Sequence, residues 1–452
     1  MEATTTGHEV STYVSLLKAC SKTKDLVRGC SIHVDVVTNG LLQWSPHVGS
    51  SLISMYVKCG MLRKAFDVLL HLVNRNVISW NALITGYAQW GQPIDAFLCF
   101  ERMQNEGLLP DETTLSCLLK ACSHMQNVEM GRRIHNVVMW TELLGKDLVL
   151  GNALVEMYVK CGKVTEAEKV LDKLPIRNVV AWSSLILGYT NQGKAKEALT
   201  CFERMRNEGI YPNTATLLPV LKACGIASEL DKGKQIHEEI ICKGLFTGEI
   251  RVGTALMDMY AKCGMLANAK NVLDELLFPD VISWNMLISG YVQHGIDETA
   301  LNSLNCMKNE GLFPNSITFI CLLRACGRTG SITIGKQIHN ELIGICMVPN
   351  HTTLSNGLMD MYAKCGEMAH AQKVLDEIPD RNLVSWNILI SGYVQQGQGG
   401  QALECFELLQ AEGLFPNAIT YTCILKACAV IGAIQKGNEI HGEIDKQGLL
   451  KV

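Results

Sequence analysis

The chain of 452 residues repeats itself at a fixed step of 102 residues. The step separates four tryptophans, Trp80, Trp182, Trp284 and Trp386. It also separates cysteines that close an (L/V/I)L(K/R)AC phrase, at Cys20, Cys122, Cys224, Cys326 and Cys428. No insertion interrupts the four complete copies, which is typical of units that stack directly on one another. The repeat therefore favours a solenoid over a set of separate globular domains.

Each period divides into three helical hairpins of 35, 36 and 31 residues. In the unit at 281–315, Trp284, Leu287, Ile288 and Tyr291 fall at i, i+3, i+4 and i+7, which is one apolar face of a helix. The closing phrase NEGLFPN combines a helix-terminating glycine with a proline that prevents continuation. No strand-like alternation occurs along the chain, so the sequence predicts an all-α solenoid.

Composition limits the ligands that the chain can bind and the compartments in which it can work. The net charge is −4, so any nucleic acid must meet a local basic groove and base contacts, because the chain as a whole is not a polycation. The 19 cysteines lie mostly inside apolar helical patterns, which indicates free thiols in a reducing compartment. No apolar run reaches the roughly 18 residues of a membrane span. The first residues carry no apolar signal segment and no arginine, so no transit peptide is expected in them.

One cysteine and one histidine recur in each 102-residue copy, which could indicate a metal site. Each such pair offers only two ligands, and they come from different helices. Core packing is therefore the better explanation for these residues. The phrase H-x-E occurs at His237–Glu239 and His441–Glu443. Zinc cytidine deaminases follow it with P-C-x-x-C, and the chain contains no C-x-x-C. A GxxxxGK[ST] phosphate loop is also missing. We expect no catalytic residues, no metal and no cofactor.

The phrases SWNxLIxGY, LLKAC…GKQIH and NALVxMYxKCG, with units of 35, 36 and 31 residues, resemble the PLS class of plant pentatricopeptide repeat proteins. The resemblance covers residues 10–452, after a leader at 1–9, and implies a right-handed superhelical solenoid of helix-turn-helix repeats. The alternative is a tetratricopeptide-like protein-binding scaffold, whose W-x2-L-G-x2-Y phrase nearly fits Trp80, Leu83 and Tyr87. Here Gly86 lies directly before the tyrosine, and the unit length is not a uniform 34.

The resemblance divides the array into thirteen motifs of three types. The L-type motifs begin at 10, 112, 214, 316 and 418, the S-type motifs at 46, 148, 250 and 352, and the P-type motifs at 77, 179, 281 and 383.

In the pentatricopeptide family the fifth and last residues of a motif read one base of single-stranded RNA. The P-type pairs are Asn81–Asp111, Ser183–Asn213, Asn285–Asn315 and Asn387–Asn417. The S-type pairs are Ser50–Asn76, Asn152–Asn178, Thr254–Asp280 and Asn356–Asn382. An ionised Asp only accepts hydrogen bonds and so favours U or G, whereas Asn can donate to the bare ring nitrogen of C or A. The family's rule for the fifth residue adds that Asn goes with pyrimidines, and Ser or Thr with purines.

Together these rules give A, U, a gap, pyrimidine, A, a gap, G, pyrimidine, a gap and two pyrimidines, where the gaps are L-type motifs. A competing interpretation makes each last residue an ordinary N-cap, because Asn and Asp before a helix satisfy an orphan N–H. Variation among Asn, Ser and Thr at the fifth position favours base reading, since capping does not explain it.

The family also sandwiches bases with the second residue of each motif, although such residues serve equally well in packing. The residues concerned here are Ile78, Val149, Val180, Ile282 and Val384. The resemblance thus implies a non-enzymatic, sequence-specific single-stranded RNA-binding protein of the mitochondrion or chloroplast. Its expected task is to specify a site for RNA processing or C-to-U editing, with editing-factor proteins or a deaminase supplied in trans as further partners. No membrane partner is expected.

Overall fold

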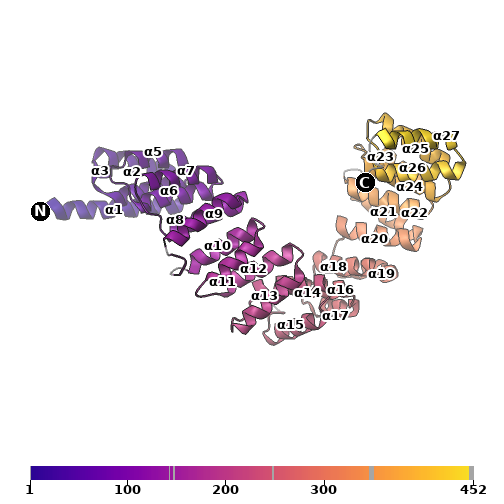
Figure 1. The fold of residues 1–452 in the computed structure, drawn as a ribbon, viewed down its shortest axis with the longest axis horizontal. Helices are drawn as coiled ribbons and strands as arrows, with labels where there is room; N and C mark the ends of the chain where they lie inside the picture. The colour runs from indigo at the N-terminus through magenta and orange to yellow at the C-terminus, as the bar shows by residue number, and fades with distance from the viewer. Residues whose placement is uncertain (1, 142, 146–147, 247–248, 346–350, 447–452) are drawn as a thin grey trace. The chain divides into compact units, whose positions relative to one another are not determined.

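The computed structural model describes residues 2–141, 143–145, 148–246, 249–345 and 351–446, and no residue in these ranges lies in a β-strand. The chain divides into two compact units, Met1–Ala223 and Cys224–Val452. In each unit, antiparallel helical hairpins follow one another along the chain (Figure 1). The all-α solenoid predicted from the repeat is confirmed.

The first helix of each hairpin begins at or close to the expected motif start. In the L-type motifs these helices are α1 (Glu2–Thr23), α8 (Glu112–Met125), α14 (Thr214–Ala227), α20 (Ser316–Thr329) and α26 (Ala418–Ile431). In the S-type motifs they are α4 (Pro46–Lys58), α10 (Leu148–Lys160), α16 (Ile250–Lys262) and α22 (Thr352–Lys364). In the P-type motifs they are α6 (Val77–Gln89), α12 (Val179–Asn191), α18 (Val281–Gln293) and α24 (Leu383–Gln395).

The second helix returns antiparallel to the first. The L-type second helices are α2 (Leu26–Thr38), α9 (Val128–Trp140), α15 (Leu230–Cys242), α21 (Ile332–Gly344) and α27 (Ile434–Lys446). The S-type second helices are α5 (Leu62–His71), α11 (Val164–Lys173), α17 (Leu266–Glu275) and α23 (Met368–Glu377). The P-type second helices are α7 (Pro93–Asn105), α13 (Ala195–Asn207), α19 (Asp297–Asn309) and α25 (Gly399–Ala411).

Two short helices that the repeat did not predict lie in L-to-S connections. They are α3 (Leu41–Trp44) and the 3-10 helix η1 (Leu143–Gly145). The leader expected at 1–9 is described from residue 2, where α1 begins, so residues 2–9 continue the first helix without a break.

Helix ends follow the predicted stop signals. Gly295, which follows α18, has φ 75°, and Gly311, which follows α19, has φ 76°. This left-handed backbone conformation is the one that glycine adopts without steric cost, and it ends a helix by turning the chain away from the axis. Pro314 then keeps the segment before α20 from continuing α19.

First helices stack on first helices and thereby form the core. In the first unit α1, α4, α6, α8, α10 and α12 contact one another in order, and in the second α16, α18, α20, α22, α24 and α26 do the same. The four repeat tryptophans are almost completely buried in this stack. Gly86 shows how close the helices lie, because a Cβ there would sit 2.6 Å from Cγ1 of Val57. The glycine of the SWNxLIxGY phrase is therefore a packing residue.

The described cysteines are all free. Eight of them are buried, including the five that close the (L/V/I)L(K/R)AC phrases. None of the helices in the described ranges is both long enough and apolar enough to cross a membrane.

Candidate nucleic-acid interface

A groove of about 780 Å³ runs along the first helices of the first unit. It is lined by Val14, Lys18, Ser21, Lys22, His47, Ser50, Ser51, Ser54, Val57, Lys58, Ile78, Asn81, Ala82, Thr85, Gln89, Asp111 and Thr113. Four predicted site residues, Ser50, Ile78, Asn81 and Asp111, are among these and so lie at one surface.

Helical spacing places these side chains together. On α6, Ile78, Asn81 and Thr85 occupy the second, fifth and ninth positions, which fall at i, i+3 and i+7 on one side of the helix. The opposite side carries Trp80 and Leu83, which are buried against neighbouring helices. The same periodicity that buries the core therefore turns Ile78 outward, at 59% exposed, and sets Asn81 at the floor of the groove, at only 8% exposed.

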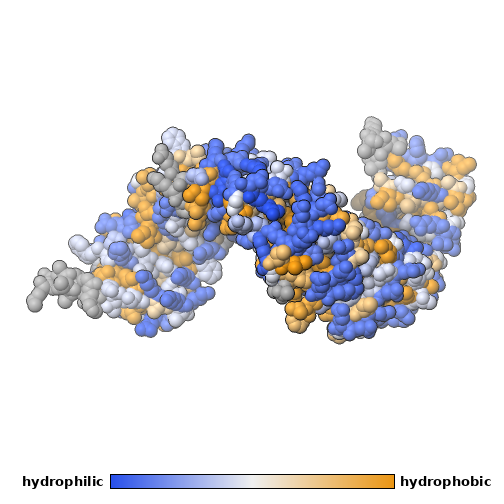
Figure 2. Space-filling view, turned by 90° about the horizontal axis from the view of Figure 1, so that it is seen from below, coloured by the Kyte–Doolittle hydropathy of each residue, from blue (hydrophilic) through white to orange (hydrophobic). Residues whose placement is uncertain are grey.

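The predicted base-sandwiching residues Ile78, Val149, Val180, Ile282 and Val384 are 52–60% exposed. Large aliphatic side chains are usually buried, so a regular exposed series is informative, whereas a single exposed residue is not. The alternative interpretation as packing residues does not describe their surroundings. Figure 2 shows hydrophobic surface, in orange, scattered among hydrophilic residues.

The structure adds two residues to this series that sequence reasoning did not single out. Ile317 and Ile419 stand at the second position of L-type motifs and are 57% and 62% exposed. The signal was present in the sequence, because they lie 102 residues apart at the position already chosen in the P-type and S-type motifs.

All eight predicted last-position residues cap the following helix. An oxygen of each side chain accepts from the backbone N–H of the third helical residue at 2.8–3.1 Å. These caps are Asn76, Asp111, Asn178, Asn213, Asp280, Asn315, Asn382 and Asn417. The capping interpretation is therefore correct for every one of them, not only for the four that precede L-type motifs.

Capping occupies one oxygen of each side chain and leaves a second polar atom. Each capping Asn bonds the helix through Oδ1, and among the described residues none of the six makes a hydrogen bond through Nδ2. Asp280 likewise caps through Oδ1 and leaves Oδ2 without a partner in the described ranges. A capping Asn thus presents a donor and a capping Asp presents an acceptor. Capping and base reading are compatible at the same residue.

The fifth-position residues are not all connected to their partners. Asn81 donates through Nδ2 to both carboxylate oxygens of Asp111, at 2.8 and 2.9 Å. Asn285 and Asn387 donate to the Oδ1 atoms of Asn315 and Asn417, at 3.0 and 3.4 Å. These three P-type pairs are each joined directly across two consecutive hairpins.

The S-type pairs behave differently. Ser50 donates to the Pro46 carbonyl at 2.8 Å and Thr254 to the Arg251 carbonyl at 3.0 Å, so each hydroxyl bonds its own helix. No hydrogen bond within the described ranges joins these residues, or Asn152, to their last-position partners.

Basic side chains that sequence reasoning missed enter the groove. Lys18, Lys22 and Lys58 line it beside Asp111. Lys18 is the basic residue of the LLKAC phrase, and the same repeat position carries the exposed residues Lys120, Lys222, Arg324 and Lys426. One positive charge therefore recurs every 102 residues on the first helix of an L-type motif, although the chain is net negative. Such local charge attracts a phosphate backbone.

The basic residue that ends each S-type first helix is partly neutralised. Lys160, Lys262 and Lys364 pair with Glu156, Asp258 and Asp360 one turn earlier, at 2.6–2.7 Å. In the first copy Ser54 replaces the carboxylate. Lys58 consequently lines the groove without an acidic residue one turn before it.

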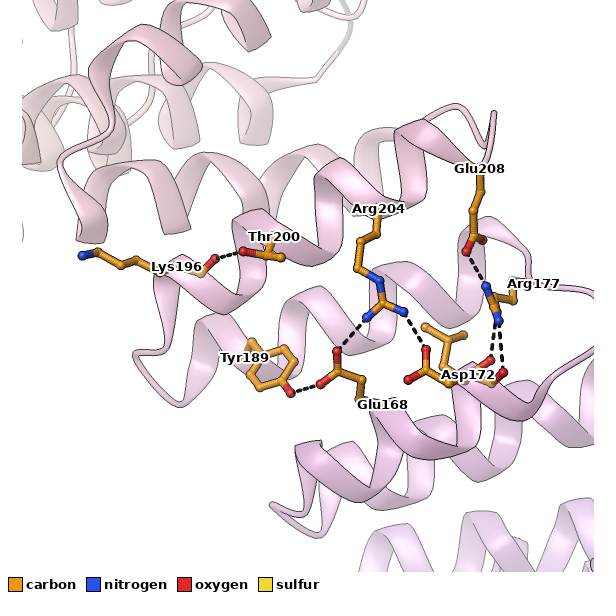
Figure 3. Close-up of polar contacts among 9 residues, drawn as sticks. Glu168, Asp172, Arg177, Tyr189, Lys196, Thr200, Arg204 and Glu208 are labelled. Atoms are coloured by element: carbon orange, nitrogen blue, oxygen red, sulfur yellow. Dashed lines mark hydrogen bonds and ion pairs between the residues drawn. The ribbon is translucent and has the colours of Figure 1, made fainter.

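A polar clamp holds the loops that carry the last-position residues (Figure 3). Arg177, which precedes Asn178, donates to Glu208 and, at 3.0 Å, to the carbonyls of Leu171 and Asp172. Glu208 also accepts from Nε1 of the buried Trp182 at 3.2 Å. Equivalent clamps form at Arg75–Glu106–Trp80 and Arg381–Glu412–Trp386. In the third copy Pro279 replaces the arginine, and Trp284 still donates to Glu310 at 2.7 Å.

Arg204 supports the same hairpin. Its guanidinium bonds Glu168 at 2.8 Å and Asp172 at 2.6 Å (Figure 3). The guanidinium also lies over the Trp182 ring. Tyr189 also donates to Glu168. These contacts fix α11, α12 and α13 to one another, and with them the ends that present Asn178 and Asn213.

The recurring histidines have a structural partner. Nδ1 of His33, His135, His237 and His339 lies 2.8–2.9 Å from the hydroxyl of the tyrosine in the next S-type first helix. Within the described ranges, no group of three or more His, Cys, Asp or Glu side chains is arranged to hold a metal ion.

Comparison with known proteins identifies the repeat. The profile of the PPR repeat family matches residues 75–124, 177–225, 279–328 and 381–430. A second profile, of the PPR repeat, matches residues 50–77, 152–179, 254–277 and 354–383. Together the two profiles account for more than half of the chain.

Curated relatives and solved structures agree. A chloroplastic pentatricopeptide repeat-containing protein of Arabidopsis thaliana is 34% identical over 93% of the chain and 67% of its own length. A mitochondrial one from the same plant is 32% identical over 95% of the chain and 62% of its own length. The chain spans about half to two thirds of the length of the curated relatives that it matches.

The crystal structure of the pentatricopeptide repeat protein PPR10 from maize has the same fold, with a TM-score of 0.66 at 20% identity over 97% of this chain and 69% of that one. A second structure of PPR10, in complex with an 18-nt psaJ RNA element, gives a TM-score of 0.59 at 17% identity over 95% of this chain and 72% of that one. On the profile matches and the relatives alike, the chain belongs to the pentatricopeptide repeat family.

Proposed function

We propose that the chain is a sequence-selective single-stranded RNA-binding protein of the PLS class, with one base for each reading pair. One observation carries the proposal. Each of the six capping Asn residues and Asp280 caps a helix with one oxygen and leaves a second polar atom, a donor on Asn and an acceptor on Asp280, without a partner in the described ranges. Asp111 differs, because both of its carboxylate oxygens accept from Asn81. Base edges are read by such donors and acceptors.

The surroundings of these atoms suit RNA. Exposed aliphatic residues such as Ile78 and Ile282 can lie against base faces beside the reading pairs. Lys18 and its counterparts supply positive charge for the phosphates. The structure of PPR10 in complex with an 18-nt RNA element supports the proposal, because PPR10 has the same fold as this chain.

We further propose that the bound site directs RNA processing or C-to-U editing in a mitochondrion or chloroplast. Relatives named chloroplastic and mitochondrial support this location. In this proposal the deaminase or other editing factors are supplied in trans, and the chain itself contributes recognition.

The test is an electrophoretic mobility shift at fixed salt with a thirteen-base RNA. The RNA carries A, U, C, A, G, C, C and C at the positions of the eight pairs. A second RNA replaces G by A opposite Thr254–Asp280. We expect tight binding that weakens about tenfold with the replacement, which is the scale of one good base contact. Equal binding to both RNAs would reduce the last-position residues to caps, and no binding would favour a protein-binding scaffold instead.

A further inference from the structure

A buried hydroxyl from the next hairpin joins several of the reading pairs. Thr114, Thr216, Thr318 and Thr420 stand at the third position of α8, α14, α20 and α26, and each is at most 1% exposed. RNA cannot touch these side chains. Any effect that they have on recognition must pass through the residues that they contact.

The hydroxyl bonds fix the fifth-position amide. Thr318 Oγ1 lies 2.6 Å from Oδ1 of Asn285 and 3.2 Å from Oδ1 of Asn315. Because a hydroxyl carries one hydrogen, the shorter contact takes it, and Oγ1 itself accepts from the Asn315 backbone N–H at 3.1 Å. Thr420 repeats this arrangement with Asn387 at 2.7 Å and Asn417 at 3.0 Å. Thr114 donates likewise to Oδ1 of Asn81.

This contact selects one of two amide orientations. An asparagine amide turned by 180° exchanges its oxygen and its NH₂ group, and so exchanges an acceptor for a donor. With the threonine hydrogen on Oδ1, the NH₂ group of Asn285 must point toward Asn315. The reversed orientation would lose both the 2.6 Å bond from Thr318 and the 3.0 Å bond to Asn315, and would set Oδ1 of Asn285 against Oδ1 of Asn315, which is unfavourable because two acceptors cannot bond each other. The pair therefore presents a single pattern of donors to a ligand.

The S-type motifs contain a natural comparison. Asn356–Asn382 and Asn152–Asn178 are pairs of identical residue types at the same motif positions. Ser385 donates to Asn356 Oδ1 at 2.7 Å and lies 3.2 Å from Asn382 Oδ1. At the equivalent position after Asn178 stands Ala181, which has no hydroxyl to offer. The Ser385 hydroxyl therefore fixes the amide orientation of Asn356, whereas no hydroxyl at position 181 fixes that of Asn152.

We propose that the third residue of the following helix is a positioning residue for base selection, since its buried hydroxyl fixes the orientation of the fifth-position amide. The proposal rests on the RNA-binding function proposed above. Each such site is then a triad, made of the fifth and last residues of a motif and the third residue of the following helix. The proposal predicts that Asn356–Asn382 discriminates between bases more sharply than Asn152–Asn178 does.

The test measures a ratio, namely the affinity for the RNA with C divided by that for the RNA with A opposite one pair. Ser385→Ala should lower this ratio about fivefold at the nucleotide opposite Asn356–Asn382, the scale of one hydrogen bond. Ser385→Thr should restore it, because the other triads use threonine. Ala181→Ser should raise the ratio at the nucleotide opposite Asn152–Asn178 by a similar factor.

Ser79→Ala is the matched control. Among the described residues, the Ser79 hydroxyl hydrogen-bonds the backbone of Asn76 alone, at 2.7 Å to its carbonyl and 3.1 Å from its N–H, and makes no hydrogen bond to Ser50. Its removal takes a third-position hydroxyl from a capping box and frees no fifth-position amide, because Ser50 occupies the fifth position of that motif. The base ratio opposite Ser50–Asn76 should therefore stay unchanged, even if binding to every RNA weakens somewhat.

The outcomes separate the two proposals. If the wild-type chain binds none of the RNAs, RNA binding fails and the triad proposal fails with it. If the wild type binds but Ser385→Ala and Ala181→Ser leave both ratios unchanged, only the triad proposal is overturned. A uniform loss of affinity in Ser385→Ala with an unchanged ratio would assign Ser385 to helix stability and would also overturn it. Circular dichroism melts identify a variant that fails to fold, and Ala181→Ser then decides.

Discussion

At the scale of single residues, the side chain in the last position of a motif caps a helix and, in the proposed function, also reads a base. Asn315 accepts from the N–H groups of Ile317 and Thr318 through Oδ1, and its Nδ2 has no partner in the described ranges. The cap holds the side chain in one orientation, which decides that the remaining atom is a donor. Replacing Asn by Asp keeps the cap, because both residues cap well. The replacement changes the atom that does not cap from a donor, Nδ2, to an acceptor, Oδ2.

The recurring His–Tyr pairs give a prediction at this scale. Burial lowers the pKa of His135 below its ordinary value of 6.5, and the nearby Lys173 lowers it further. Nδ1 faces the Tyr158 hydroxyl, and the buried Nε2 has no hydrogen-bond partner among the residues that the structure describes. Protonation would place a positive charge and an unpaired N–H in the interior, which is costly.

The unfolded chain therefore binds more protons than the folded chain once the pH falls below about 6.5, and stability falls with pH from there. We expect the melting temperature to drop between pH 7 and pH 5. His135→Gln should show a smaller drop than the wild type. Melts followed by circular dichroism at matched ionic strength measure the difference, and identical pH profiles for the two proteins would contradict this account of His135.

The sequence predicts which residues form the candidate site but not every hydrogen bond between them. The sequence identified the variable residues, because a polar position that varies inside a repeated helix stands out. It missed the bridge from Thr318 to Asn285, because a hydrogen bond between two hairpins depends on how their helices align. A step of 102 residues links the four threonines, yet third-position threonines also suit capping boxes, so their spacing alone does not reveal the contact.

At the scale of helices and hairpins, the repeat predicts almost the whole fold. Helix stops at Gly295 and Gly311 follow from residue chemistry, and the tryptophans are buried as their periodicity requires. The short helices α3 and η1 could not be predicted, since L-to-S connections differ in sequence from copy to copy. The helices were predicted from the repeat, and the sequence of these connections does not repeat.

The clamp around Trp182 gives a prediction at the scale of the hairpin. Glu208→Ala removes the acceptor of the Trp182 indole N–H, which is buried, and should cost about 1–3 kcal/mol in the free energy of unfolding. Arg177→Ala removes the partly exposed ion pair with Glu208, worth about 0–1 kcal/mol, and the bonds from Arg177 to the carbonyls of Leu171 and Asp172. We expect a smaller loss than from Glu208→Ala, because the indole N–H of Trp182 keeps its acceptor. Chemical denaturation followed by circular dichroism measures both changes.

The third copy supplies the control for this prediction. Pro279 occupies the place of Arg177, and the bond between Trp284 and Glu310 persists without the arginine. Glu310→Ala should therefore destabilise the chain about as much as Glu208→Ala does. A larger loss from Arg177→Ala than from Glu208→Ala would show that the ion pair, and not the indole bond, holds the loop.

At the scale of the whole molecule, the proposed RNA recognition has to arise from many modest contacts. The net charge of −4 excludes general electrostatic attraction to RNA, so the recurring basic position of the L-type motifs has to act locally. Reading pairs and triads occur in both compact units. Specificity then depends on how many pairs match a given strand, and a change in one pair should alter one nucleotide preference while the rest stay as they are.

The most direct measurement of the central claim is therefore an exchange of preference at one pair. Wild type and Asp280→Asn are compared, at one salt concentration, on RNAs with G or A opposite Thr254–Asp280. The cap on α18 is retained in the variant, so its melting temperature should match that of the wild type.

We predict that the wild type prefers G and that Asp280→Asn prefers A, each by about tenfold. The reciprocal change Asn213→Asp should convert the preference for A at Ser183–Asn213 into one for G. If wild type and Asp280→Asn bind the two RNAs with the same ratio, the last-position residues are caps alone and the account of base reading is wrong.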